Sequence, residues 1–215
     1  MLGGYGLRAD DVRGVTRIIL ESRLTRLQGF HACCWLTGDI LIDAGFVKTA
    51  PLLLDFLDGK RVRAVACTHH HEDHTGGAGL VAGRHRCPVY LNRPEERFSE
   101  GLGDMKFYRR LWWGRPAEYE PEQMPERLEG DGLELVCVPT PGHSATHCAF
   151  FDPKGGVLFS GDLYIAPGAT AIMSHENPYL LAESLKRVAE LEPRYMMTGH
   201  GLVMKGPAGA LRQKA

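Results

Sequence analysis

Short runs of apolar residues, separated by glycine, proline and charged residues, recur along the whole chain. Runs of about four to eight apolar residues between such turn residues are typical of strands buried in a sheet. The pattern predicts strands near residues 15–21, 31–37, 39–43, 62–68, 88–91, 132–138, 147–151, 157–160 and 195–198.

Between several of these strands the apolar residues follow helical spacing. Segment 47–57 carries its leucines on one side of a helix, and a second helix is expected over 73–82. The clearest helix covers 178–191, because it begins at Pro178, has one apolar face and is followed by Pro193. The sequence therefore predicts three helices between the strands.

The order of these elements predicts the fold class. Strands come first and are followed by alternating strands and helices, and this arrangement occurs twice. It favours an α/β protein in which two β-sheets pack face to face, with helices outside. A chain of 215 residues with 44% apolar content can bury a sizeable core as a single domain, with two small lobes as the alternative.

The densest polar cluster of the chain follows the predicted strand at 62–68. Residues 68–74 read THHHEDH, and the potential metal ligands among them are His69, His71, Asp73 and His74. In an extended chain, His69 and His71 point the same way because side chains alternate. Imidazole favours zinc, iron or copper, and a carboxylate extends this range to manganese. The alternative interpretation is a solvated histidine-rich loop.

Three further candidate ligands occur where an apolar run ends in glycine. They are His143, Asp162 and His200, each directly after a glycine. Glycine lets the backbone turn sharply without a Cβ clash, and functional residues gather on loops at the ends of strands. We therefore expect three strand ends to converge with residues 69–74 on one site.

Five motifs together resemble one known family. HxHxDH at 69–74, TPGHS at 140–144, FSGD at 159–162 and TGHG at 198–201 occur in the order typical of the metallo-β-lactamase superfamily, and LIDAG at 41–45 is similar to an early strand and turn of that family. The resemblance extends from about residue 15 to residue 201. It implies an αββα sandwich of two mixed β-sheets with helices on the outer faces.

The resemblance also implies a role for each ligand. One metal would be held by His69, His71 and His143, a second by Asp73, His74 and His200, and Asp162 would bridge both. Two divalent metal ions per chain are expected, with zinc as the first choice and iron or manganese as alternatives. Every ligand position of the two-metal pattern is filled, which argues against a metal-free member of the family.

The activity implied by the resemblance is hydrolysis. A small ester, thioester or lactone would be cleaved by attack of a metal-bridging hydroxide, as in the glyoxalase II and lactonase branches, and Asp73 would act as general acid and base. Two alternatives stay open: phosphodiester hydrolysis, including nuclease action, and a persulfide-dioxygenase-like oxidation in which His69, His143 and Asp162 hold a single iron. Because only 15 residues follow His200, no C-terminal substrate domain is expected, which counts against a glutathione thioester.

Residues beside the motifs have more than one interpretation. Tyr164 shortly follows the implied bridging aspartate, where some related lactonases use a tyrosine hydroxyl to steady the substrate carbonyl, so catalysis and core packing are equal alternatives. His147 and Asp43 are expected to support the ligands rather than to bind metal. Surface or structural roles are expected for the remaining histidines, which are His31, His70, His85 and His175.

Segment 92–130 has a composition of its own. Arginines alternate with aromatic residues in it, among them Arg109, Trp112 and Trp113. We expect either a lid-like insertion that borders the site, where it would suit an acyl chain or an anionic group, or a helical insertion whose aromatic residues pack on the core. An exposed pair of Trp112 and Trp113 would be a contact surface for a homodimer.

Charge and composition narrow the choice of partners. A net charge of −1 gives no basic footprint for nucleic acid, so a small-molecule substrate is expected. No run reaches the roughly 18 apolar residues of a membrane span, and no secretory signal is visible, so a cytoplasmic location is expected. The six cysteines have no CxxC spacing, and we expect them, Cys67 included, to be reduced and structural.

Overall fold

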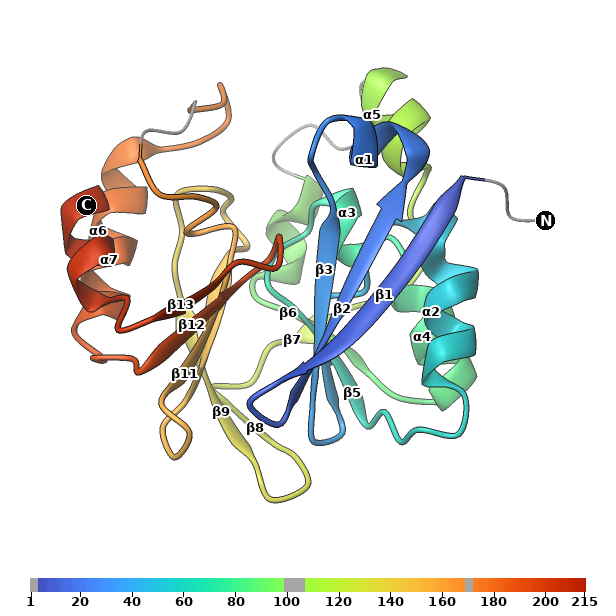
Figure 1. Cartoon of the computed structure of the whole chain (residues 1–215), viewed down its shortest axis with the longest axis horizontal. Coiled ribbons are helices and arrows are strands. Elements are labelled where there is room, and N and C mark those ends of the chain that lie inside the picture. The colour runs from blue at the N-terminus through green and yellow to red at the C-terminus, as the bar shows by residue number, and fades with distance from the viewer. Residues whose placement is uncertain (1–3, 99–106, 169–171) are drawn as a thin grey trace.

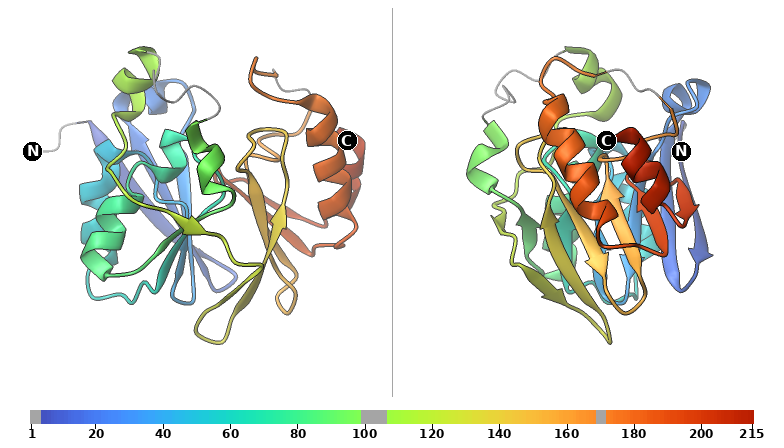
Figure 2. Two further views of the ribbon diagram at one scale, coloured as in Figure 1. Left: turned by 180° about the vertical axis from the view of Figure 1, so that it is seen from behind. Right: turned by 90° about the vertical axis from the view of Figure 1, so that its left-hand side faces the viewer.

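Two β-sheets packed face to face form the centre of the molecule (Figures 1 and 2). The computed structural model describes residues 4–98, 107–168 and 172–215. The strands are β1 (Tyr5–Val12), β2 (Val15–Ser22), β3 (Ala32–Thr37), β4 (Ile40–Ile42), β5 (Ala64–Cys67), β6 (Val89–Leu91), β7 (Glu122–Gln123), β8 (Arg127–Glu129), β9 (Glu134–Pro139), β10 (Cys148–Asp152), β11 (Val157–Gly161), β12 (Tyr195–Thr198) and β13 (Val203–Lys205). The α-helices are α1 (Arg23–Leu27), α2 (Ala50–Leu57), α3 (Glu72–Thr75), α4 (Ala78–His85), α5 (Phe107–Trp113), α6 (Pro178–Ala189) and α7 (Ala208–Lys214). Short 3-10 turns cover Val47–Thr49 and Pro94–Phe98.

Both sheets are mixed. The first has the order β1-β2-β3-β4-β5-β6-β7, antiparallel from β1 to β4 and parallel from β4 to β7. The second has the order β13-β12-β11-β10-β9-β8, and only its β11 and β12 run parallel. With helices on the outer faces, this is the αββα sandwich expected from the sequence, and the predicted fold class is confirmed.

Strand β3 explains why the central strands are apolar without alternation. Cys33 and Trp35 belong to the core between the two sheets, whereas Cys34 and Leu36 belong to the core beneath the helices of the first sheet. Successive side chains of a strand point to opposite faces. Because both faces of the sheet are covered, both sets of positions must be apolar.

Helices cover the outer face of each sheet (Figure 1). On the first sheet, α2 and α4 pack through Leu53, Leu57 and Val81. On the second sheet, α6 and α7 pack through Leu185, Leu211 and their apolar neighbours. The candidate ligands lie just after the ends of strands β5, β9, β11 and β12.

Two of the differences from the sequence expectations have a clear physical reason. Strand β1, which pairs with β2 over its whole length, was not predicted because residues 5–12 are largely polar and exposed. The helix expected over 73–82 is divided into α3 and α4 at Gly76 and Gly77. A Cβ at Gly76 would lie 2.5 Å from both the Glu72 carbonyl oxygen and the Val47 nitrogen, so the break allows a close approach of two backbones.

Segment 92–130 is built into both sheets. Its β7 pairs with β6 in the first sheet and its β8 pairs with β9 in the second. The expected exposed tryptophan pair is wrong for Trp113, which is 9% exposed and packs against the rings of Phe30 and Phe46. The lid role and the homodimer stay predictions, and residues 99–106 of this segment lie outside the described residues.

Across the described ranges, no helix combines the length and the apolar character needed to cross a bilayer. All six cysteines are free thiols, and four of them, Cys33, Cys34, Cys67 and Cys148, are buried.

We predict that Trp35→Phe destabilises the fold by about 2–4 kcal/mol. The indole Nε1 of Trp35 donates to the Thr198 carbonyl oxygen at 3.0 Å, and its ring packs between the sheets against Phe159. Phenylalanine would remove this hydrogen bond, so that the carbonyl keeps only the backbone N–H of Gly201 as a donor, and it would open a small cavity between the sheets. Urea unfolding at equal metal content measures the change. Tyr179→Phe, at an 83% exposed side chain, is the control, and equal stability of the two variants would contradict the prediction.

Candidate metal centre

The loop after β5 carries four of the predicted ligands. The chain leaves β5 at Cys67, bends over residues 68–70 and enters α3, whose first residue is Glu72. This bend brings the rings of His69 and His71 toward each other, with 2.9 Å between Nε2 of His69 and Nδ1 of His71. The turn of α3 brings His74 to the same place, since its ring lies 4.2 Å from that of His69.

Three strand ends supply the other predicted ligands. His143 follows β9, Asp162 follows β11 and His200 follows β12. A Cβ at Gly199 would lie 2.5 Å from Asp162 Oδ1 and 2.7 Å from His74 Cε1. Glycine is therefore required before His200 because the backbone passes directly over the ligand cluster. The structure brings all seven predicted ligand residues together.

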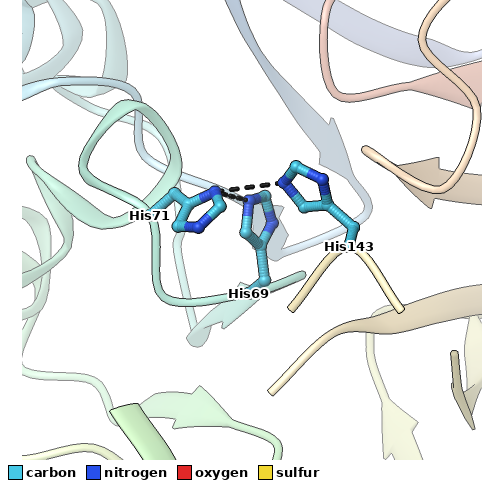
Figure 3. A group of neighbouring side chains, drawn as sticks. All are labelled: His69, His71 and His143. Carbon is cyan, nitrogen blue, oxygen red and sulfur yellow. Dashed lines mark hydrogen bonds between the residues drawn. The ribbon is translucent and has the colours of Figure 1, made fainter. Parts of the chain in front are cut away.

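The first group of ligands consists of His69, His71 and His143 (Figure 3). His71 Nδ1 lies 2.9 Å from His69 Nε2 and 3.1 Å from His143 Nε2. Nitrogens bound tetrahedrally to one zinc ion, at about 2.05 Å from it, are about 3.3 Å apart. The three ring nitrogens are thus close to the separation that a metal ion would impose.

The second group consists of Asp73, His74 and His200. His74 Nε2 lies 3.7 Å from Asp73 Oδ2. The carboxylate of Asp162 lies between the two groups, with Oδ1 at 3.4 Å from His74 Nε2 and Oδ2 at 3.1 Å from His200 Nε2 and 3.6 Å from His143 Nε2. One aspartate is therefore within reach of both groups.

Buried Asp43 orients one histidine of each group. Its Oδ2 accepts the Nδ1–H of His74 at 2.8 Å. The hydroxyl of Thr68 donates to the same Oδ2 at 2.9 Å, and its oxygen lies 3.1 Å from Nδ1 of His69. Because the hydroxyl hydrogen of Thr68 is donated to Asp43, the hydroxyl oxygen accepts a hydrogen bond from the Nδ1–H of His69. In the neutral form of either ring, the proton is therefore on Nδ1 and the lone pair of Nε2 faces the cluster, which is the orienting role expected for Asp43.

Two other ligands are oriented from elsewhere in the fold. Nδ1 of His143 donates to Glu176 Oε1 at 2.5 Å, and Nδ1 of His200 donates to the backbone carbonyl oxygen of His31 at 2.7 Å. Each bond fixes the tautomer that exposes Nε2 to the cluster.

His147 supports the cluster and does not face it. Its Nδ1 lies 2.8 Å from the hydroxyl of Thr140, and its Nε2 accepts the backbone N–H of Asp162 at 3.2 Å. Burial, together with the neighbouring His143, lowers the pKa of His147 to about 3. The ring of His147 is therefore neutral, and the lone pair of its Nε2 is already used in a hydrogen bond. These contacts fit the supporting role that was expected for His147 from the sequence.

The electrostatics of the cluster favour a cation. Burial alone would lower the pKa of His74, but Asp162, Asp43 and Asp73 raise it well above its usual value. Burial alone would raise the pKa of Asp162, but His200 and His74 hold it well below its usual range. Across the described ranges, these three carboxylates form ion pairs only with histidines.

Two buried atoms in the cluster lack a hydrogen-bond partner. Within the described part of the chain, His74 Nε2 and Asp162 Oδ1 are buried and make no hydrogen bond. Buried polar groups are nearly always paired or bound to metal. Imidazole and carboxylate ligands, converging lone pairs and unneutralised buried charge together fit first-row divalent metal ions.

Tyr164 lies away from this cluster. It is 3% exposed and belongs to the core beneath α6 and α7, and the ammonium of Lys214 lies 4.8 Å from the centre of its ring. It also borders a cavity of about 650 Å³ that contains none of the predicted ligands. Of the two roles left open for Tyr164, these contacts favour packing, and the catalytic role stays a prediction without support from its position.

Sequence reasoning missed three residues that border the cluster. Glu176 binds His143, and the exposed ring of His175 lies 5.4 Å from that of His71. Arg109 on α5 forms an ion pair at 2.5 Å with Glu72, a buried carboxylate between two ligands. His175 and Glu176 lie in a loop far from every motif, and nothing in their local pattern relates them to His71 or His143. The Arg109 pairing similarly depends on how segment 92–130 folds back.

Comparisons with known proteins agree with this geometry. The sequence model of the Metallo-beta-lactamase superfamily matches residues 36–200. Probable metallo-hydrolase YflN of Bacillus subtilis is 28% identical over 202 residues, with 78% of this chain and 76% of that protein covered. Hydroxyacylglutathione hydrolase of Bdellovibrio bacteriovorus is 27% identical over 67% of this chain, and the match spans about half, 52%, of that enzyme's length.

Solved structures give the same result. The structure described as TTHA1623 in a di-iron-bound form is 28% identical, with a TM-score of 0.66 over 84% of this chain and 93% of that one. A beta-lactamase domain protein from Burkholderia ambifaria has a TM-score of 0.71 at 21% identity, covering 96% of this chain and 73% of that one, and it shows the fold alone. The chain therefore belongs to the metallo-beta-lactamase superfamily, and it is a metal-dependent hydrolase of that superfamily.

Proposed function

We propose that the protein cleaves a small ester, thioester or lactone with two divalent metal ions held by the seven clustered residues. The observation that carries this proposal is the position of Asp162, whose two carboxylate oxygens lie within 3.6 Å of histidines from both groups. His69, His71 and His143 would hold one ion, Asp73, His74 and His200 the second, and Asp162 would bridge them. Two ions about 3.5–4 Å apart would supply an activated water and polarise the substrate carbonyl.

The residues of the chain have distinct tasks in this proposal. Asp162 sets the spacing of the two groups and offsets positive charge between them. Asp73, at the edge of the second group, would take the proton released in the attack at a carboxylate oxygen and return it to the leaving group. Asp43 and Glu176 hold the rings of His74 and His143 in their ligand orientation.

The comparisons support the ester and thioester class in particular. The name hydroxyacylglutathione hydrolase, which several relatives carry, describes a thioester substrate. The match covers about half of the length of these relatives. Zinc is the ion expected for histidine-rich ligands. Iron is the alternative that the di-iron-bound relative favours.

The first test is pH-stat proton release across lactones, thioesters, simple esters and phosphodiesters by metal-reconstituted protein. We expect release from the carboxylic substrates and not from the phosphodiesters. Asp162→Ala should lower kcat by at least about a hundredfold and reduce the bound metal. Asp58→Ala, which removes a 69% exposed carboxylate, is the matched control and should retain both.

Three results would contradict the proposal. They are full activity of metal-depleted Asp162→Ala, preferred release from phosphodiesters, and oxygen consumption with glutathione persulfide in place of proton release. The last result would favour a single iron held by His69, His143 and Asp162.

We further predict that Asp43→Asn weakens metal binding by about 10- to 100-fold without unfolding the protein. Asparagine keeps the shape of the side chain but loses the charge. Its single carbonyl oxygen can replace either Oδ1, which accepts the backbone N–H of Thr68, or Oδ2, which accepts the Nδ1–H of His74, but not both. Competition with a chelator measures the change in metal affinity, and Asp58→Asn is the matched control. Unchanged affinity would show that Asp43 does not orient the ligands.

A further inference from the structure

Exposed apolar side chains are concentrated on two segments of the surface. In the described part of the chain, the large exposed hydrophobic residues are Leu24, Leu27, Leu80, Leu111, Ile172, Met173, Tyr179 and Leu180. All except Leu80 lie either on α1 and α5 or between residue 172 and the start of α6. We call these the first lip (Leu24, Leu27 and Leu111) and the second lip (Ile172, Met173, Tyr179 and Leu180). Isolated exposed leucines are ordinary, but their concentration on two segments indicates a binding surface.

The first lip is attached to the second group of metal ligands. Phe30, just after α1, has its ring 4.3 Å from that of His200 and 5.6 Å from that of Trp113 on α5. Arg109 on α5 is bound to Glu72 in the ligand loop. Helices α1 and α5 therefore border the same side of the site.

The second lip is attached to the first group of ligands. Glu176 binds Nδ1 of His143 with one carboxylate oxygen and the backbone N–H of Met173 with the other, at 2.7 Å. The backbone N–H of Asn177 donates to the Gly142 carbonyl oxygen at 2.7 Å, and the Asn177 side chain caps α6 at Tyr179 and Leu180. Figure 1 shows α1, α5 and the segment from residue 172 into α6 at the same end of the molecule, with α3 below α1.

The polar residues of the first lip select the charge of the ligand. Helix α1 contains Arg23 and Arg26, of which Arg26 is paired with Glu21 of β2 at 2.9 Å, and α5 adds the exposed Arg110. An apolar surface with guanidinium groups accepts a neutral or anionic amphiphile and disfavours a cationic one.

We propose that the two lips bind the acyl chain of the substrate, so that the enzyme prefers esters or thioesters of medium-chain fatty acids over those of acetate. This inference rests on the proposed hydrolysis and specifies its substrate. The segments that carry the lips contact the ligand cluster, one through Phe30 and Arg109 and the other through Glu176 and Asn177. A chain extending from a carbonyl at the metals therefore has apolar surface near it on both segments. A methylene that becomes fully buried strengthens binding about fourfold, and a half-buried one about twofold.

The test is a series of acetyl, butyryl, hexanoyl, octanoyl and decanoyl thioesters, kept below their micellar concentrations and assayed with the metal-loaded enzyme. The expected result is a kcat/KM that rises about twofold for each added methylene. The double variants Leu27→Ser with Leu111→Ser, and Tyr179→Ser with Leu180→Ser, should flatten this rise. Leu80→Ser removes a leucine of α4 that is 40% exposed and lies outside both lips, and it should leave the rise intact.

A second readout does not depend on catalysis. Decanoate should bind the metal-free protein more tightly than hexanoate, as followed by the tryptophan fluorescence of Trp112 and Trp113 on α5. Each double lip variant should reduce that difference, and Leu80→Ser should not.

The outcomes separate this inference from the proposed function. Hydrolysis that does not depend on chain length, or a chain-length dependence that the lip variants leave unchanged, overturns the acyl-chain assignment and leaves the hydrolase proposal standing. A change of molecular mass in the lip variants with an intact chain-length dependence would assign the lips to contact with a second copy of the chain. The absence of hydrolysis across the whole series contradicts the proposed function itself.

Discussion

The buried carboxylate of Asp43 is the constraint on which the site depends. It lies in a left-handed backbone conformation with φ of 59°, and its oxygens bind both Thr68 and His74. Through Thr68 it also fixes His69, so one side chain sets the rings of both ligand groups. A carboxylate that is 1% exposed and has, among the described residues, only a histidine as its ion-pair partner brings negative charge into the interior. A cation between the groups neutralises that charge, and the backbone turns of the surrounding strands hold the ligands in place for it.

The layered fold could be predicted because hydrophobic burial on two faces leaves a direct pattern. Apolar runs identified the buried central strands, and the amphipathic helix that packs as α6 was equally visible. Strand β1 could not be predicted, since its stability comes from pairing with β2 and not from its own apolar residues. The division between α3 and α4 depends on the contact of Gly76 with the distant Val47, which no local pattern contains.

The candidate ligands were predictable for a different reason, because ligand chemistry restricts residue type and each ligand follows a strand end. The residues that orient those ligands were only partly predictable. Asp43 lies in a motif and His147 follows one by three residues, whereas Glu176, His175 and Arg109 come from a loop and from segment 92–130. Their roles depend on where a distant segment folds back. The carbonyl group of His31 could not have been predicted from residue type, because the backbone and not the side chain makes the bond.

Anomalous diffraction from crystals of the metal-loaded protein tests the central claim most directly. The account predicts two peaks about 3.5–4 Å apart. One would be bound by His69, His71 and His143 and the other by Asp73, His74 and His200, with Asp162 between them. A single peak bound by His69, His143 and Asp162 alone, with the second group vacant at saturating metal, would contradict it.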